Sequence, residues 1–313
     1  MMIKPNALQF GSTIGVVAPS SPVSKKIADE SKKALEELKF KVKMGSSCYE
    51  RYGYLAGNDN IRAEDINNMF SDEEVDGIIC LRGGYGSIKI LNLIDYEMIK
   101  SNPKVFIGYS DITALHLAIH KKCNMVTIHG PMVSSDMLNG FDDFSKESLF
   151  NTIMKNESIG LIKNPDGEEI HCLVPGKARG KLIGGNLSLI AAVMGTPYAL
   201  NMKNKIVFIE ETEEEPYRID RMFTQLVLSG MLNEAAGIVL GDFRNCEAKD
   251  AFESLSLMEV FNDILKPLHI PVIYNVKAGH CTKKISLPFG TTAYIDAGNC
   301  KLIIEESAVK IMP

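Results

Sequence analysis

Strand-like and helix-like segments alternate along the first half of the chain. Predominantly apolar runs, as in buried strands, occur at 13–18, 76–81 and 104–108. Apolar residues at helical spacing predict helices over 23–39, 60–70, 88–93 and 113–120. This alternation predicts a parallel sheet covered on both faces by helices, an α/β fold. In such sheets ligands bind at the carboxyl ends of the strands.

The alternation of strand-like and helix-like segments ends after residue 135. The stretch 164–169 is polar and turn-rich, and Pro175-Gly176 follows it, which is typical of a connection between domains. Beyond it, strands are predicted at 206–210, 237–241, 272–275 and 291–296, and helices at 187–194 and 218–228. With 313 residues, the chain suits two domains. We expect an N-terminal domain over 1–155, a linker over 156–176 and a C-terminal domain over 177–313.

Composition excludes several classes of protein. The net charge of −5 argues against a nucleic-acid surface, which needs a basic face. No stretch approaches the length of a membrane span, and the N-terminus has no apolar run of signal-peptide type. The seven cysteines are scattered without CxxC spacing, which suits free thiols in a reducing compartment. We therefore expect a cytoplasmic protein that binds neither nucleic acid nor membrane.

The segment Gly108-Tyr109-Ser110-Asp111 lies where a predicted strand meets a helix. A serine on such a turn presents its hydroxyl at an exposed corner, as in the nucleophile elbow of hydrolases. The backbone N–H of Asp111 can then face a developing oxyanion. The elbow pattern is Gly-x-Ser-x-Gly, and its last position is occupied here by Ile112. The alternative is that Ser110 or Asp111 only caps the following helix.

A second turn, Arg82-Gly83-Gly84-Tyr85-Gly86, follows another buried strand. Glycines there allow a backbone N–H to approach a ligand closely, so Gly83 and Gly84 are candidate oxyanion donors. The spacing matches neither Gly-x-Gly-x-x-Gly nor the P-loop, so a phosphate site is disfavoured. The alternative is a tight turn between strand and helix without further function.

A serine nucleophile needs a base, and the sequence offers six histidines: 116, 120, 129, 171, 269 and 280. His116 and His120 are four apart on a helix, but no HExxH pattern accompanies them, so a metal pair is disfavoured. His129 and His280 both follow predicted strands, and the residues alone leave several bases open. Glu210 ends a buried apolar strand, where a carboxylate needs a partner. The following acids, Glu213 to Glu215, are typical of a solvated loop.

Six segments in this order resemble the LD-carboxypeptidase family, also called murein tetrapeptide carboxypeptidases. They are Gly15–Ser20, Arg82–Gly86, Gly108–Asp111, Gly184–Ser188, the Glu210-Glu211 pair with Pro216–Arg221, and Gly279-His280. The resemblance covers nearly the whole chain. It implies a catalytic triad of Ser110, Glu210 and His280, with the N–H groups of Asp111 and of Gly83 or Gly84 as oxyanion donors. The family usually has Glu-Asp where this chain has Glu210-Glu211.

The resemblance also implies a fold and a reaction. The fold is a Rossmann-like parallel sheet domain followed by a smaller β-rich α/β domain, with the nucleophile on the first and the other triad members on the second. The reaction is release of terminal D-alanine from a cytosolic murein tetrapeptide through an acyl-enzyme. Family members are commonly homodimers and need no metal or other cofactor.

A carboxypeptidase must also bind a free carboxylate of its peptide. Arginine binds carboxylates bidentately, which makes Arg82, Arg218 and Arg221 candidates. Tyr85 is a further candidate for substrate binding. The simpler interpretation of Arg218 and Arg221 is that they pair with the acidic residues beside them.

Two other functions are compatible with these patterns. Microcin C self-immunity peptidases resemble this chain and use a similar triad on peptidyl-adenylates. Their nucleotide contacts are aromatic and often include tryptophan, which this chain lacks. That absence and the chain length favour cell-wall recycling. A non-catalytic protein that binds a small ligand on a doubly wound sheet is the other alternative.

Overall fold

The structure is a computed structural model that describes residues 2–138, 140–250 and 252–311. Contacts divide the chain into two compact units. The first comprises Met1–Glu157, Ser286–Gly290 and Ser307–Pro313, and the second comprises Ser158–Ile285 and Thr291–Glu306. Each unit therefore contains more than one segment of the chain.

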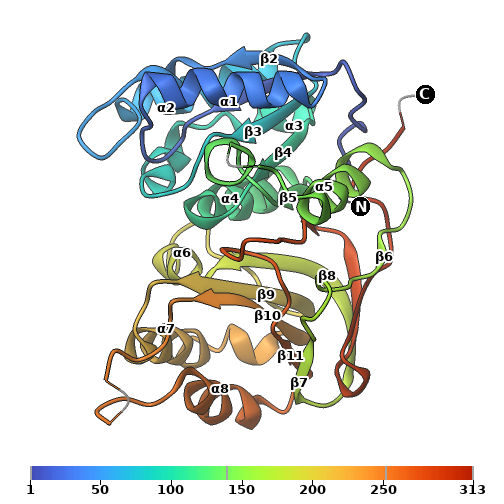
Figure 1. Cartoon of the computed structure of the whole chain (residues 1–313). Coiled ribbons are helices and arrows are strands. Elements are labelled where there is room, and N and C mark those ends of the chain that lie inside the picture. Colours follow the sequence, from blue (N-terminus) through green and yellow to red (C-terminus); the bar gives the residue numbers. More distant parts are fainter. Residues whose placement is uncertain (1, 139, 251, 312–313) are drawn as a thin grey trace. The chain divides into compact units, whose positions relative to one another are not determined.

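The first unit is built on a six-stranded sheet with the strand order β12-β5-β4-β3-β1-β2 (Figure 1). Its strands are β1 (Thr13–Val17), β2 (Lys41–Met44), β3 (Gly77–Cys80), β4 (Val105–Gly108), β5 (Thr127–His129) and β12 (Leu287–Phe289). All of them pair in parallel except β12, which is antiparallel to β5. The predicted α/β fold with a parallel sheet is confirmed.

Five α-helices accompany this sheet in the described part of the unit: α1 (Lys25–Glu37), α2 (Asp59–Ser71), α3 (Tyr96–Ser101), α4 (Thr113–Cys123) and α5 (Asp143–Met154). The central strands are buried along their whole length, which is why they read as continuous apolar runs. The segment predicted as an α-helix at 88–93 is a 3₁₀ helix, Ser87–Leu93. It begins directly after the glycine turn, as a short connecting 3₁₀ segment.

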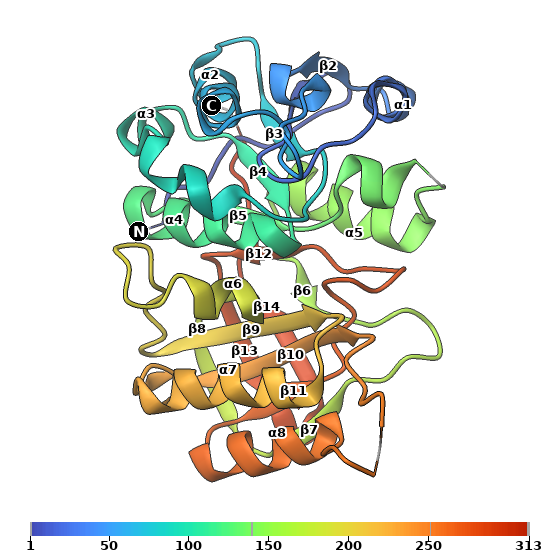
Figure 2. The same cartoon turned by 90° about the vertical axis from the view of Figure 1, so that its left-hand side faces the viewer.

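The second unit contains an eight-stranded mixed sheet with the order β6-β14-β13-β8-β9-β10-β11-β7. Its strands are β6 (Gly160–Leu161), β7 (His171–Val174), β8 (Lys177–Asn186), β9 (Lys205–Thr212), β10 (Gly237–Arg244), β11 (Val272–Tyr274), β13 (Thr292–Asp296) and β14 (Lys301–Ile304). The central strands β8 to β11 are parallel, and the outer pairs are antiparallel. Helices α6 (Leu187–Ala192), α7 (Pro216–Leu228) and α8 (Leu257–Leu265) lie in front of these strands in Figure 2.

The stretch 156–176, which the sequence predicts as a connection, includes β6 and β7. β6 pairs with β14 and β7 pairs with β11, so both strands lie at edges of the second sheet. Their partners lie far along the chain, as in the pair of Cys172 with Ile273, which explains why local pattern does not predict them.

No helix within the described ranges is both long and apolar enough to cross a membrane. All seven cysteines lie in the described part of the chain and are free thiols.

A buried arginine links α2 to two loops of the first unit. The Arg62 side chain is fully shielded from solvent. Its guanidinium donates to the carbonyls of Pro19 and Gly86, and the bond to Gly86 is 2.8 Å long. It also donates to the carboxylate of Asp59. The arginine therefore ties together the loops that follow β1 and β3.

We predict that Arg62→Ala lowers the free energy of unfolding by about 3 kcal/mol, because two buried carbonyls lose their donor and a large cavity opens. Urea unfolding followed by circular dichroism measures the change. Arg51→Ala is the matched control, since Arg51 is exposed. Equal stability of the two variants would contradict this role for Arg62.

Candidate active site

Ser110 occupies a strained backbone position at the end of β4. Its φ angle is +64°, in the left-handed region that serine rarely adopts. The residue is half-buried and begins a short 3₁₀ helix, Ser110–Ile112, that leads into α4. The N-cap of α4 is Ile112, and no side chain caps that helix, so the interpretation of Ser110 or Asp111 as a helix cap is wrong. Strain of this kind persists where the surrounding structure enforces it, often at functional sites.

The glycine turn after β3 packs directly against Ser110. A Cβ atom on Gly83 would lie 2.9 Å from the Ser110 Cβ and 3.0 Å from its Oγ, which is closer than real atoms approach. The same position lies 3.5 Å from the backbone nitrogen of Asp111. Gly84 has a φ of +116°, and a Cβ there would collide with the Ser21 side chain. Gly83 therefore packs against Ser110, Gly84 packs against Ser21, and side chains at these two positions would clash with those neighbours.

The buried carboxylate of Asp111 holds three loops of the first unit together. It accepts hydrogen bonds from Ser20 Oγ at 2.5 Å and from Ser87 N–H at 2.8 Å. The Ser87 hydroxyl in turn donates to the Asp111 carbonyl. Burial raises the pKa of Asp111, and the hydrogen bonds from Ser20 and Ser87 oppose that shift. Ser20 ends the Gly15–Ser20 segment and Ser87 follows the Arg82–Gly86 turn, but the sequence pattern predicts no role for either residue.

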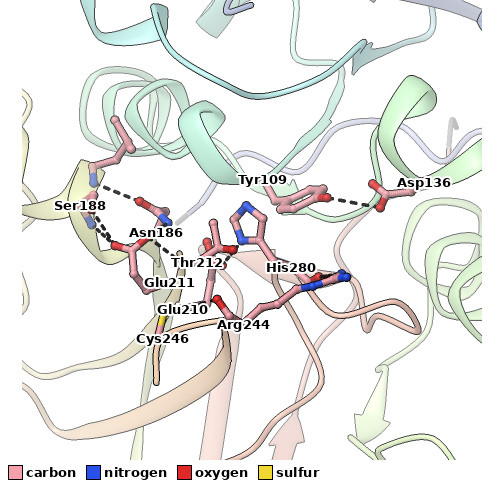
Figure 3. Close-up of polar contacts among 11 residues, drawn as sticks. Tyr109, Asp136, Asn186, Ser188, Glu210, Glu211, Thr212, Arg244, Cys246 and His280 are labelled. Carbon is pink, nitrogen blue, oxygen red and sulfur yellow. Dashed lines mark hydrogen bonds and ion pairs between the residues drawn. The ribbon is translucent and has the colours of Figure 1, made fainter. Parts of the chain in front are cut away.

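In the second unit, Glu210 and His280 form a close pair (Figure 3). Glu210 Oε2 lies 2.6 Å from His280 Nδ1, at the carboxyl end of β9. The glutamate is fully buried, while 16% of the His280 side chain is exposed. Gly279 makes this approach possible, because a Cβ there would lie 2.7 Å from Glu210 Oε2 and its φ is +108°.

The electrostatics of this pair favour a charged imidazole. Burial lowers the pKa of His280, but the hydrogen bond and the negative charge of Glu210 outweigh it, so the pKa stands above its ordinary value. An imidazole with Nδ1 held by a carboxylate has a defined tautomer and orientation, as a general base requires.

The neighbouring Glu211 has different contacts. Its carboxylate accepts hydrogen bonds from Asn186 Nδ2 at 2.7 Å, from Ser188 N–H at 2.8 Å and from Ser188 Oγ at 2.7 Å. Burial raises the pKa of Glu211, and these hydrogen bonds oppose the shift. Of the two adjacent acids, Glu210 therefore contacts the imidazole, whereas Glu211 fixes the start of α6.

The candidate substrate-binding residues Arg82, Tyr85 and Arg218 have different surroundings. Arg82 lines a cavity of about 940 Å³ within the first unit. Tyr85 is 49% exposed and its ring packs edge-on against that of Tyr54. Arg218 pairs with Glu214 at 3.3 Å and lies against the ring of Tyr217, which fits the simpler structural interpretation.

Two histidines of the first unit, His116 and His129, are buried in its core. His116 bonds through Nε2 to the carbonyl of Gly108 at 2.8 Å, and burial lowers its pKa to about 4. His116 and His129 both pack against the ring of Phe289. Within the described ranges, no three His, Cys, Asp or Glu side chains are grouped as metal ligands would be.

We predict that Glu210→Gln lowers the pKa of His280 below that of the unchanged protein. The variant loses the negative charge, while the desolvation that disfavours imidazolium remains. NMR titration of the imidazole measures the shift. Glu211→Gln is the matched control, because Glu211 does not bond to His280 and exerts only a weaker charge effect on it. An unchanged pKa in Glu210→Gln would contradict the dominance of this pair.

Comparison with known proteins identifies the family and the fold. Residues 14–130 match the model of the LD-carboxypeptidase N-terminal domain, and residues 179–295 match that of the C-terminal domain. A probable murein peptide carboxypeptidase of Bacillus subtilis is 42% identical over 305 residues, covering 96% of this chain and 94% of the relative. The microcin C7 self-immunity protein MccF of Escherichia coli is 27% identical. That alignment covers 96% of this chain and 94% of MccF.

Among solved structures, a muramoyltetrapeptide carboxypeptidase from Oxalobacter formigenes superposes with a TM-score of 0.84. It is 28% identical, and the alignment covers 95% of this chain and 99% of that one. The predicted Rossmann-like first domain and β-rich second domain agree with this likeness. The chain is a serine peptidase, and it belongs to the LD-carboxypeptidase family.

Proposed function

We propose that this protein is a serine carboxypeptidase that releases the terminal D-alanine from murein tetrapeptides during cell-wall recycling. Ser110 is the proposed nucleophile, His280 the base and Glu210 the carboxylate that orients it. The observation that carries the proposal is the 2.6 Å contact between a fully buried Glu210 and the partly exposed His280. The left-handed backbone at Ser110 and the glycine turn against it supply independent support.

The first chemical step forms a tetrahedral intermediate on Ser110. His280 Nε2 removes the proton from Ser110 Oγ as that oxygen attacks the scissile carbonyl carbon. Glu210 accepts the Nδ1–H bond and stabilises the imidazolium that results. The carbonyl oxygen becomes an oxyanion, and the N–H groups of Asp111 and of Gly83 or Gly84 donate to it.

The intermediate then collapses to an acyl-enzyme, and the two products leave in turn. His280 gives its proton to the amine of D-alanine as the peptide bond breaks. Water then attacks the acyl carbon while His280 removes a proton from it, and Ser110 leaves with a proton returned from the imidazolium. The chain's own residues supply every proton transfer, so the proposed mechanism requires no cofactor.

The proposal locates the reaction in the cytoplasm, where murein peptides return for reuse. Seven free thiols are compatible with that reducing compartment. A homodimer stays a prediction from the family resemblance, and sedimentation velocity measures it directly.

We predict that the purified protein releases D-alanine from L-alanyl-γ-D-glutamyl-diaminopimelyl-D-alanine, and that Ser110→Ala slows this release by about a thousandfold or more. An enzyme-coupled assay of free D-alanine gives the rate. Ser101→Ala is the control, since Ser101 is an exposed serine of α3. Full activity of Ser110→Ala would overturn the assignment of the nucleophile.

The same preparation distinguishes the alternative functions. The self-immunity relative gives reason to test an aminoacyl-adenylate analogue as a second substrate. Cleavage of that analogue without release of D-alanine would select the immunity function. Binding of peptide without turnover of either substrate would select a non-catalytic binding protein.

We predict that kcat/KM declines on the acidic side with an apparent pKa above 6.5, because His280 must be neutral to act as a base and its pKa is raised from that value. Activity therefore increases as pH rises through the His280 pKa. Glu210→Gln moves the acidic decline of kcat/KM to lower pH. It also lowers the maximum of kcat/KM, since the imidazolium loses its stabilising charge. A decline that does not move in Glu210→Gln would assign the titration to another group.

A further inference from the structure

A charged depression lies beside His280, entirely within the second unit. It has a volume of about 460 Å³, within the range of small-molecule sites. Asp242, Arg244 and Lys277 line it, together with Cys281, the residue that follows the proposed base. None of these residues belongs to the sequence motifs described above.

Two of the charges in this depression are already compensated. Lys277 Nζ lies 3.3 Å from Glu168 Oε2 and 3.8 Å from Asp242 Oδ1. Burial raises the pKa of Asp242, and the positive charges of Lys277 and Arg244 oppose that shift. The lysine is therefore a poor candidate for binding a further anion.

Arg244 differs from Lys277 because no carboxylate in the described part of the chain forms an ion pair with it. Its guanidinium is exposed and donates through Nη1 to the backbone carbonyl of His280 at 2.9 Å. Figure 3 shows the Arg244 side chain extending alongside the His280 segment. One edge of the guanidinium is thus occupied, and its other donors remain available for an incoming anion.

The position of this guanidinium is fixed by the backbone around it. The end of β10 is joined to the segment 276–280 by two further hydrogen bonds, from Val276 N–H to the Leu240 carbonyl at 3.1 Å and from Asp242 N–H to the Ala278 carbonyl at 3.0 Å. The register of β10 on β9 shifts between Leu240 and Phe243, which redirects the strand end that carries Arg244. The backbone that carries Arg244 is therefore joined to the segment that carries His280.

We propose that Arg244 binds a carboxylate of the peptide substrate next to the bond on which His280 acts, an inference that rests on the proposed function. A planar guanidinium that is held in place and lacks a carboxylate partner suits bidentate recognition of a carboxylate. Two carboxylates of a murein tetrapeptide lie next to that bond, whereas the free α-carboxylate of the γ-linked D-glutamyl residue lies one residue further away. One is the C-terminus of D-alanine, and the other is the side chain of a diaminopimelate at the third position.

The terminal carboxylate is the expected source. It is attached to the same carbon as the amine that His280 protonates, so a cation tied to the His280 backbone lies on the leaving-group side. This would make Arg244 the residue that restricts the enzyme to the end of a chain.

The experiment compares the unchanged protein with Arg244→Gln and Arg244→Lys on four tetrapeptides. They carry diaminopimelate or lysine at the third position, each with a free or an amidated C-terminus. We expect Arg244→Gln to reduce kcat/KM by about 10–100-fold on both peptides with a free C-terminus and to change it little on the amidated pair. Arg244→Lys should retain part of the activity, because it keeps the charge without the planar fork. Arg51→Gln is the control for an exposed arginine elsewhere.

The pattern of losses decides the outcome. A loss confined to the diaminopimelate peptides, whatever their C-terminus, also supports carboxylate binding and assigns it to the third residue. An equal loss on all four peptides would overturn the proposal, because Arg244 would then bind neither of the two carboxylates next to the scissile bond.

A binding measurement separates this test from that of the proposed function. Calorimetry with the same four peptides compares Ser110→Ala with the double variant Ser110→Ala/Arg244→Gln. If the unchanged protein releases no D-alanine, the proposed function fails while the calorimetry still tests the carboxylate site. Equal affinity of both variants for every peptide would overturn the carboxylate site alone.

Discussion

A carboxylate removed from water requires a partner, and the second unit is organised around this requirement at Glu210. The side chain ends a central strand and is fully buried, so an unpaired charge there would cost several kcal/mol. His280 meets it at 2.6 Å, and a glycine at 279 is the residue that allows the approach. The strand end, the loop and the imidazole orientation therefore depend on one another, and a change at any of them disturbs the other two.

The first unit meets a different constraint, which is backbone strain at a single residue. A left-handed serine costs about 1–3 kcal/mol and persists only where its surroundings hold it. At Ser110 the buried carboxylate of the next residue supplies part of that support, through hydrogen bonds from Ser20 and Ser87. Gly83 packs against the Ser110 side chain. The proposed nucleophile is thus positioned by neighbours that carry no reactive group.

Sequence reasoning succeeded where the pattern is local. The apolar run at 104–108 is the strand β4, and the helix predicted at 113–120 continues to Cys123. It failed for edge strands such as β2, where lysines alternate with apolar residues and stability comes from pairing with a distant strand. The motif residues at strand ends were found from spacing and resemblance. Arg244 was not, because an arginine at a strand end looks like an ordinary surface charge until its contact with the His280 carbonyl is seen.

The path of the chain has a consequence for how the protein can be divided. The polypeptide leaves the first unit after Glu157, returns for Ser286–Gly290 and returns again at Ser307. The short return contributes β12, which covers the outer edge of β5. A fragment ending at residue 157 would leave that edge without its neighbour, and exposed edges of this kind invite pairing between molecules. Separate expression of the first half is therefore a route to aggregation, and a fragment built to represent the first unit needs the β12 segment joined to it.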